Sequence, residues 1–311
     1  MKLAMVFPGQ GSQAVGMVRA YEGLPDVEAV RSEAASVLGP DFIRLLDEGP
    51  ADALGLTVNT QPAMVTAGYA AYRAWMALGG PKPAVVAGHS LGEYTALVAA
   101  GSISFGGCLP LVRHRAEAMQ KAVPAGDGAM AAILNMGDDL VRAACAEAAQ
   151  GQVVQAVNFN GPGQVVIAGN RDAVARAMEL CKAKGAKRAL LLPVSAPFHS
   201  SLMQPAADAL KAYLEGVDVR TPEFPVINNV DVNVVSDPAA IKDALVRQAA
   251  SPVRWVETIE RMAEMGVTHV VECGPGKVLA GLSKRINDNL QGFALADRAA
   301  LERALAAVRA T

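Results

Sequence analysis

The sequence predicts an α/β fold with a largely parallel sheet and a smaller inserted unit. Short apolar runs alternate with amphipathic helical stretches near the start of the chain and again towards its end. Between these two parts the expected order of elements changes to βαββαβ. The chain has 311 residues, of which 52% are hydrophobic and 19% charged, so it is long and apolar enough to bury a large core.

The first part of the chain carries the alternating pattern. Residues 1–7 form an apolar run that predicts a buried strand, and the glycine-rich segment 8–13 follows it as a loop. A helix is expected to begin near Asn59, and the apolar run 84–87 predicts the next strand. Ser104 suits the N-cap of a later helix. Strands that alternate with helices in this way are expected to pair in parallel.

The middle of the chain predicts a compact insert. Its expected elements, in order, are strand 130–134, helix 137–149, strands 153–159 and 165–168, helix 172–184 and strand 189–194. This order is that of a ferredoxin-like unit, and segments rich in proline and glycine border it. We therefore predict a subdomain over 125–194, inserted into a core formed by 1–124 and 195–311.

Composition excludes several classes of protein. The formal net charge is −2, from 28 Lys and Arg against 30 Asp and Glu, so a nucleic-acid partner is not expected. The four cysteines lie far apart without metal-ligand spacing, which favours a reducing cytoplasm. The apolar run at the start is too short for a signal peptide. Glycines interrupt the uncharged stretch 94–112, so no membrane span is expected.

The segment Gly88-His89-Ser90-Leu91-Gly92 is the strongest chemical signal. It has the form G-x-S-x-G between an expected strand and an expected helix, as in a nucleophile elbow. Such a turn exposes the serine hydroxyl, and the N–H of Leu91 then points where an oxyanion would form. The alternative is an ordinary strand-to-helix turn with a capping serine. Because both the motif and its setting match, we favour Ser90 as a nucleophile.

A nucleophilic serine needs a base, and the chain has four histidines. His89 lies inside the turn and is expected to shape it, while His114 lies between two arginines on a helix, as a surface histidine would. His269 begins an apolar strand and is either structural or, because it comes late in the chain, the base. His199 lies where the insert rejoins the core, and clefts between domains favour binding sites. The residues alone rank His199 ahead of His269.

Two other segments allow more than one interpretation. The loop 9–14 fits a dinucleotide-binding fingerprint with Glu33 downstream, a plain glycine-rich connection, or a backbone that supplies a second oxyanion donor. The segment 274–277 lacks the spacing of a phosphate-binding loop and is expected to be a structural turn. Arg115 is either a solvated helix residue, which is the more common case, or a bidentate clamp for a substrate carboxylate.

Taken together, these motifs resemble the malonyl-CoA:acyl carrier protein transacylases of type II fatty acid synthesis. The resemblance runs from Leu3 to beyond Lys277. The segments that carry it, in order, are 7–13, 88–93, the Arg115 helix ending in Met119-Gln120, 158–160, 198–200, 251–253 and 274–277. It implies an α/β-hydrolase-like core with an inserted ferredoxin-like subdomain.

The resemblance also implies a role for each site residue. Ser90 would be the nucleophile that becomes acylated, and His199 its general base. The N–H groups of Gln10 and Leu91 would form the oxyanion hole, and Arg115 would bind the free carboxylate of the malonyl group.

Further implications concern selectivity and histidine orientation. A main-chain carbonyl, at the position of Ser251, would orient the histidine, and Phe198 matches a residue that accompanies malonyl selection. Ala116 departs from the glycine common in the family and could tighten the pocket.

The resemblance implies the partners as well. These are malonyl-CoA and holo-acyl carrier protein, with no cofactor and no metal, and the chain would act as a monomer in the cytoplasm. The basic run 182–188 could dock an acidic carrier protein, although a solvated helix end is the preferred interpretation.

Three other functions stay open on the residues alone. A serine hydrolase would share the nucleophile and pass the acyl group to water. A scaffold that binds carrier protein would not need Ser90, His199 and Arg115 together. A dinucleotide-dependent oxidoreductase would use the loop 9–14 but has no role for the serine elbow.

Overall fold

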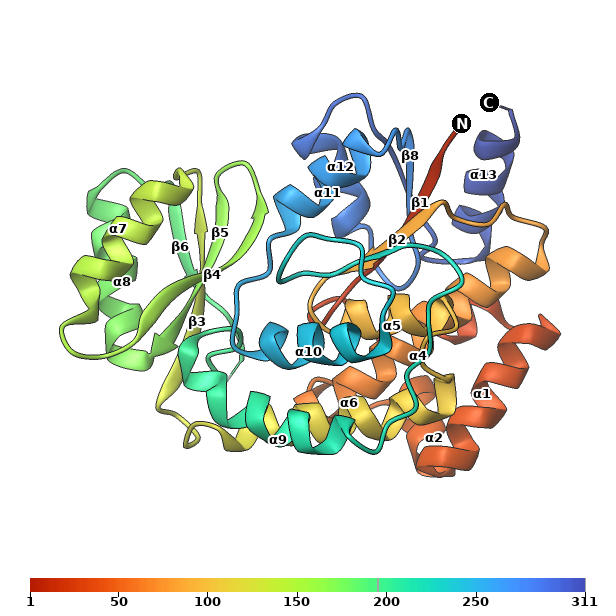
Figure 1. Ribbon diagram of the computed structural model, residues 1–311, viewed down its shortest axis with the longest axis horizontal. Helices are drawn as coiled ribbons and strands as arrows, with labels where there is room; N and C mark the ends of the chain where they lie inside the picture. Colours follow the sequence, from red (N-terminus) through yellow and green to blue (C-terminus); the bar gives the residue numbers. More distant parts are fainter. Residues whose placement is uncertain (195, 311) are drawn as a thin grey trace.

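The computed structural model describes residues 1–194 and 196–310, so Ser195, at the predicted second boundary of the insert, and Thr311 lie outside the described residues. Two separate sheets organise the fold, one in the core and one in the smaller unit (Figure 1). The predicted parallel core sheet and βαββαβ insert are confirmed. The insert boundaries at 125 and 194 stay a prediction.

The larger sheet has five strands in the order β7-β2-β1-β8-β9, and all of its pairs are parallel. The strands are β1 (Leu3–Phe7), β2 (Val85–Gly88), β7 (Val226–Ile227), β8 (His269–Glu272) and β9 (Gln291–Ala294). Ala4 of β1 lies opposite Val85 on one side and Val270 on the other. Phe7 and Gly88, the last residues of β1 and β2, lie opposite each other. The loops that follow these two strands therefore lie side by side.

Helices cover both faces of the larger sheet. Alternate residues of β1 point to opposite faces, so Met5 packs in one apolar cluster and Val6 in another. One face is covered by α11 (Trp255–Glu264) and α12 (Val278–Ile286). The other face packs against the larger helical group: α1 (Pro25–Leu38), α2 (Pro40–Glu48), α3 (Ala51–Leu54), α4 (Thr57–Ala77), α5 (Gly92–Ala99), α6 (Phe105–Lys121), α9 (Gln204–Leu214), α10 (Pro238–Ala249) and α13 (Arg298–Arg309).

The smaller sheet is antiparallel, with the order β4-β5-β3-β6 that a ferredoxin-like unit requires. Its elements are β3 (Gly128–Leu134), α7 (Asp138–Ala149), β4 (Val154–Gly161), β5 (Gln164–Asn170), α8 (Arg171–Ala183) and β6 (Arg188–Leu191). The two helices lie on one face of the sheet and share an apolar cluster with it (Figure 1). On the opposite face Met130 and Val166 pack with Phe198 of the core.

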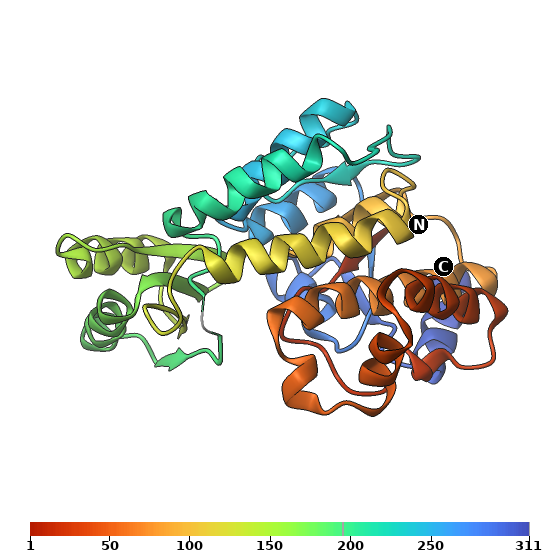
Figure 2. The same ribbon diagram turned by 90° about the horizontal axis from the view of Figure 1, so that it is seen from below.

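A helix and a short strand bridge are among the connections that join the units. Helix α6 lies beside α9 and leads from the core into the insert (Figure 2). A short bridge pairs Asn158 of β4 with Val253 of the core, through hydrogen bonds of Val253 N to Val157 O (2.8 Å) and Phe159 N to Val253 O (3.0 Å). The face of the small sheet that meets the core is thereby held against the end of the parallel sheet.

The predicted elements agree with the structure to within a few residues. Helix α4 begins two residues before Asn59, and Ser104 caps α6 by accepting a hydrogen bond from the N–H of Gly107 at 3.1 Å. Strand β6 ends at Leu191, short of the predicted 194. A turn separates α5 from α6 in the uncharged stretch 94–112. None of the described helices combines the length and the apolar character needed to cross a bilayer.

Candidate active site

Ser90 lies on a strained turn between β2 and α5. Its φ of 52° is in the left-handed region, which residues other than glycine rarely adopt. Two glycines make the turn possible by close backbone contact. A Cβ at Gly88 would lie 1.8 Å from the carbonyl carbon of Gly92, and a Cβ at Gly92 would lie 2.0 Å from the carbonyl oxygen of Phe7. The segment therefore has the geometry of a nucleophile elbow.

Asn229 fixes this turn from outside. Its Oδ1 accepts a hydrogen bond from the N–H of Ser90 at 2.8 Å, and its Nδ2 donates to the carbonyl of Gly88 at 2.7 Å. The residue follows the short strand β7, and it is fully buried. Sequence reasoning missed Asn229, because the contact spans 139 residues and no local pattern marks it.

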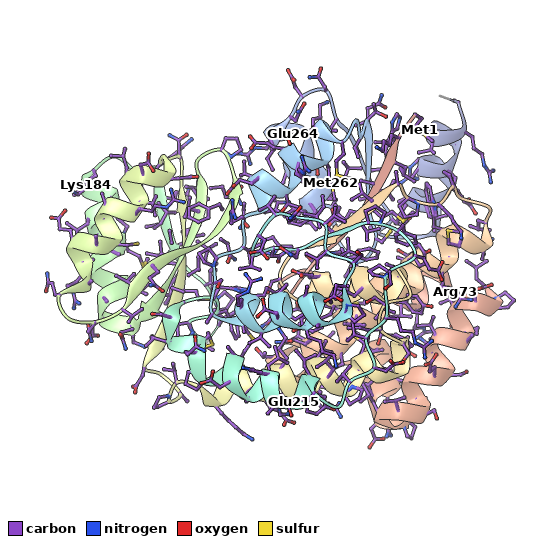
Figure 3. All side chains as sticks on the ribbon, viewed as in Figure 1. Met1, Arg73, Lys184, Glu215, Met262 and Glu264 are labelled. Carbon is purple, nitrogen blue, oxygen red and sulfur yellow. The ribbon has the colours of Figure 1, made fainter. Side chains whose placement is uncertain are left out.

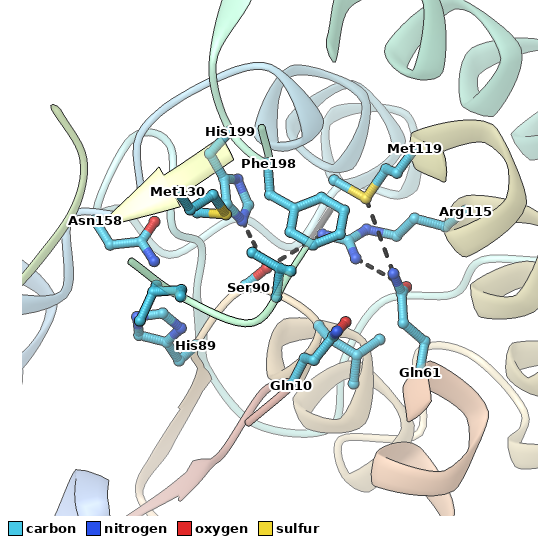
Figure 4. Close-up of a pocket in the computed structure, with 13 residues that line it drawn as sticks. Gln10, Gln61, His89, Ser90, Arg115, Met119, Met130, Asn158, Phe198 and His199 are labelled. Carbon is cyan, nitrogen blue, oxygen red and sulfur yellow. Dashed lines mark hydrogen bonds between the residues drawn. The ribbon is translucent and has the colours of Figure 1, made fainter. Parts of the chain in front are cut away.

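His199 lies at hydrogen-bond distance from the serine. Its Nε2 is 2.7 Å from Ser90 Oγ (Figure 4). Its Nδ1 is 2.9 Å from the main-chain carbonyl oxygen of Gln248. The Nδ1–H donates to that carbonyl, so Nε2 is left as the acceptor that faces the serine hydroxyl. Burial, and next the charge of Arg115, lower the pKa of His199 to about 3. The imidazole is therefore neutral near pH 7, as a general base must be.

The carbonyl that orients His199 is not the one expected. We expected the position of Ser251, but the hydrogen bond goes to Gln248, three residues earlier, and the backbone of Ser251 has only a smaller effect on the pKa of His199. The physical reason is that Gln248 lies in the last turn of α10, where carbonyl groups have no partner within the helix.

Arg115 is buried, with 2% of its surface exposed, so the solvated interpretation of this residue is wrong. Its Nη1 donates to Gln61 Oε1 at 2.9 Å, and its Nη2 lies 3.0 Å from Gln248 Oε1 and 3.3 Å from Ser90 Oγ. Its guanidinium lies 5.3 Å from the centre of the Tyr94 ring. Burial lowers the pKa of Arg115, but the group stays charged. Among the described residues no carboxylate contacts Arg115 directly, so a buried cation with neutral partners lies beside Ser90.

The loop after β1 packs against the elbow. A Cβ at Gly9 would lie 2.7 Å from the carbonyl oxygen of His89, so the two loops touch through their backbones. Gln10 and Leu91 both line the cavity at Ser90. No helix begins at this loop, since α1 starts only at Pro25, and the dinucleotide fingerprint requires one there. The dinucleotide interpretation of the loop is therefore wrong.

These residues surround a cavity of about 120 Å³ between the core and the insert (Figure 4). Apolar side chains from both units form much of its wall, namely Met119, Met130, Leu192, Val194 and Phe198. Ser90, His199 and Arg115 meet at this cavity, where Ser90 Oγ lies within hydrogen-bond distance of both other side chains. An apolar wall with a few convergent polar groups is typical of a small-molecule site.

The other histidines make different contacts. His89 Nε2 lies 2.7 Å from Asn160 Oδ1, which agrees with its expected role in shaping the turn. His114 is half-buried and stacks on Tyr213 at 4.3 Å between ring centres. His269 is buried in β8, with its Nδ1 2.8 Å from Thr268 Oγ1 and its ring stacked on Phe293. These contacts favour the structural interpretation of His269.

Comparison with known proteins gives the family. The model of the acyl transferase domain matches residues 4–298 of the chain. The malonyl CoA-acyl carrier protein transacylase of Escherichia coli is 53% identical over 305 residues, which cover 98% of this chain and 99% of that protein. The chain belongs to the malonyl CoA-acyl carrier protein transacylase family. It is accordingly an acyltransferase.

Solved structures of transacylases agree with the fold. An acyl-carrier-protein S-malonyltransferase from Burkholderia pseudomallei superposes with a TM-score of 0.96 at 63% identity, over 98% of this chain and 100% of that chain. A malonyl-transacylase in complex with its type II polyketide synthase acyl-carrier protein has a TM-score of 0.96 at 51% identity, over 99% and 100% of the two chains.

Proposed function

We propose that this transacylase moves the malonyl group of malonyl-CoA to the phosphopantetheine thiol of acyl carrier protein, through an ester on Ser90. The observation that carries the proposal is the buried guanidinium of Arg115, 3.3 Å from Ser90 Oγ. An acyl group whose far end is a carboxylate would place that negative charge beside Arg115 when its carbonyl carbon lies on Ser90. A neutral acyl group would leave the buried cation without a counter-charge.

The first half-reaction follows from the hydrogen bonds at Ser90. His199 Nε2 takes the hydroxyl proton while Ser90 Oγ attacks the thioester carbon. The N–H groups of Gln10 and Leu91 stabilise the oxyanion, since both residues line the cavity at the serine. When the tetrahedral intermediate collapses, the carbon–sulfur bond breaks and the proton on His199 passes to the thiolate of coenzyme A. The product is the malonyl ester of Ser90.

The second half-reaction reverses these steps with the carrier thiol as the nucleophile. His199 takes the thiol proton, and the sulfur attacks the ester carbon. Breaking the carbon–oxygen bond then returns Ser90 with its proton. Between the two half-reactions the ester must resist water, and the pair of Arg115 with the malonyl carboxylate holds the acyl group away from a hydrolytic geometry. Phe198 in the cavity wall would limit branched acyl groups.

The carrier protein is proposed to approach the exposed start of β6. Lys187 and Arg188 are exposed there, and the chain after β6 continues into Leu192 and Val194 of the cavity wall. An acidic carrier would be attracted by these charges. The other end of the basic run fits docking less well, because Lys184 forms an ion pair with Glu147 at 2.7 Å and lies at the outer side of the insert (Figure 3).

The place of action is part of the same proposal. All four cysteines are free and buried, which suits the reducing cytoplasm. We infer that the chain works there as a monomer, with coenzyme A and the carrier as its partners and without a resident cofactor.

Initial-rate kinetics separate this function from a serine hydrolase. Release of coenzyme A is measured at several concentrations of malonyl-CoA and of holo-carrier protein. The proposal predicts parallel double-reciprocal lines and one malonyl-carrier formed for each coenzyme A released. Coenzyme A release that proceeds at the same rate without carrier, with free malonate as the product, would identify a hydrolase instead.

A further inference from the structure

The base of this site lacks the carboxylate of a serine–histidine–aspartate triad. His199 Nδ1 donates to a neutral main-chain carbonyl, that of Gln248. During catalysis His199 holds the proton of Ser90 and becomes a cation, while the permanent cation of Arg115 lies nearby. Arg115 already opposes protonation of this histidine. A negative charge close to the site would therefore stabilise the transition state.

Glu93 is the buried acid that is hydrogen-bonded into this network. It lies in the first turn of α5, three residues after Ser90, and is 2% exposed. Its Oε2 accepts hydrogen bonds from Gln248 Nε2 at 2.8 Å and from the N–H of Asn229 at 2.9 Å. Sequence reasoning missed Glu93, although an acid that directly follows the elbow at the start of an apolar helix was a signal.

Gln248 connects Glu93 to all three proposed site residues. Its Nε2 donates to Glu93 and also to the carbonyl of Ser90 at 3.0 Å, while its Oε1 accepts from Arg115. Because Arg115 donates on one side and Glu93 accepts on the other, only one orientation of the Gln248 amide satisfies both hydrogen bonds. Its main chain binds His199. A change at Glu93 therefore affects His199 through Gln248, and it affects the turn at Ser90 through Asn229.

We propose that Glu93 is a positioning residue that supplies, through Gln248 and Asn229, the negative charge which offsets Arg115 while His199 carries the Ser90 proton. This inference rests on the proposed roles of Ser90, His199 and Arg115. The charge of Glu93 stabilises the imidazolium of His199 with malonyl-CoA and with acetyl-CoA, because this cation forms during the transfer of either acyl group. Arg115, by contrast, distinguishes malonyl from acetyl.

The charge state of Glu93 depends on its surroundings. Burial raises the pKa of Glu93 to about 7, and the hydrogen bonds from Gln248 and Asn229 oppose this shift. The charged groups that face it are Arg115 of α6, which lowers the pKa, and Asp231 of the loop after β7, which raises it. Helix α10 presents the neutral amide of Gln248. The carboxyl therefore ionises as pH rises through about 7, far above the pKa of His199.

The test is the single-turnover rate of Ser90 acylation in the full-length chain, followed by coenzyme A release with malonyl-CoA and with acetyl-CoA. Wild type, Glu93→Gln and Glu272→Gln are compared between about pH 5.5 and 8.5. Glu272 is the matched control. It is equally buried, its pKa is also raised to about 7 by burial, and it caps α12 through the N–H of Ala280.

We expect the wild-type rate to fall as pH falls through about 7, because Glu93 takes up a proton. Glu93→Gln should be about tenfold slower than wild type at pH 8 with both donors, nearly independent of pH, and equal to wild type near pH 5.5. The affinity of Glu93→Gln for malonyl-CoA and acetyl-CoA should be unchanged, and its Tm should not be lower than that of wild type. Glu272→Gln should keep the wild-type rate and pH profile.

Other results would overturn the inference. A wild-type acylation rate that does not change through pH 7 would contradict the inference, and this result needs no variant. An acylation rate of Glu93→Gln equal to that of wild type at pH 8 would also contradict it. A loss of activity in Glu93→Gln that is explained by a lower Tm would contradict it as well. If wild type forms no ester on Ser90 at all, the proposed function fails first, and the inference fails with it.

Discussion

Arg115 and Ser90 lie within hydrogen-bond distance, although Arg115 comes from α6 and Ser90 from the turn between β2 and α5. The guanidinium Nη2 is 3.3 Å from Ser90 Oγ, and two glutamines rather than a carboxylate hold the guanidinium in place. A cation held by neutral partners remains available to a charged ligand. We propose that this relationship gives the site a preference for an acyl group that ends in a carboxylate.

Replacement of Arg115 by alanine should lower kcat/KM for malonyl-CoA by about 10²–10³-fold, because the bound carboxylate would lose its buried partner. Transfer from acetyl-CoA should fall much less, so the preference for malonyl is lost. Arg115→Lys is the control, since it keeps the charge but cannot bridge Gln61 and Gln248 together. Malonyl transfer that survives Arg115→Ala at the wild-type rate would show that the clamp is wrong.

The elbow should not tolerate a side chain at Gly88. The added Cβ would lie 1.8 Å from the carbonyl carbon of Gly92, so the backbone must shift. We expect Gly88→Ala to lower the free energy of unfolding by about 3 kcal/mol or more, measured by urea denaturation, and to abolish acylation. Gly281→Ala is the control. Its Cβ would meet no heavy atom within 4 Å, and α12 should gain up to about 1 kcal/mol. Wild-type stability of Gly88→Ala would refute this explanation of the turn.

Charge reversal separates the two ends of the basic run. Lys187→Glu should raise the KM for carrier protein about three- to tenfold and leave kcat unchanged, because it acts on encounter rather than on chemistry. Lys184→Glu should change it less than about twofold, since Lys184 is paired with Glu147. Steady-state kinetics with varied holo-carrier protein measures both. An unchanged KM in Lys187→Glu would remove this docking surface.

Features encoded by short segments could be predicted from the sequence. The strand before Gly88, the elbow at Ser90 and the cap at Ser104 each depend on neighbouring residues, and the βαββαβ order depends on element lengths and turns. Strand β7 was missed because it is only two residues long and depends on pairing with β2. Strand β9 was missed as well, since its four residues are not an apolar run.

Features that depend on distant contacts could not be predicted from residue patterns. Residue patterns alone ranked His199 only slightly ahead of His269, because the hydrogen bond to Ser90 spans 109 residues. Arg115 looked like a surface residue, since its burial depends on packing of α6 against α4 and the elbow. The carbonyl that binds His199 belongs to Gln248, about one helical turn before the expected Ser251. Which carbonyl is available depends on where α10 ends, and the sequence pattern does not define that point.

The most direct test of the account is the intact mass of the protein after brief mixing with malonyl-CoA. We predict a malonyl adduct that is absent from Ser90→Ala, persists in buffer, and disappears when holo-carrier protein is added. An adduct that decays at the same rate without carrier would contradict transfer to a carrier and indicate hydrolysis. A malonyl adduct that still forms on Ser90→Ala would contradict the assignment of Ser90 as the nucleophile.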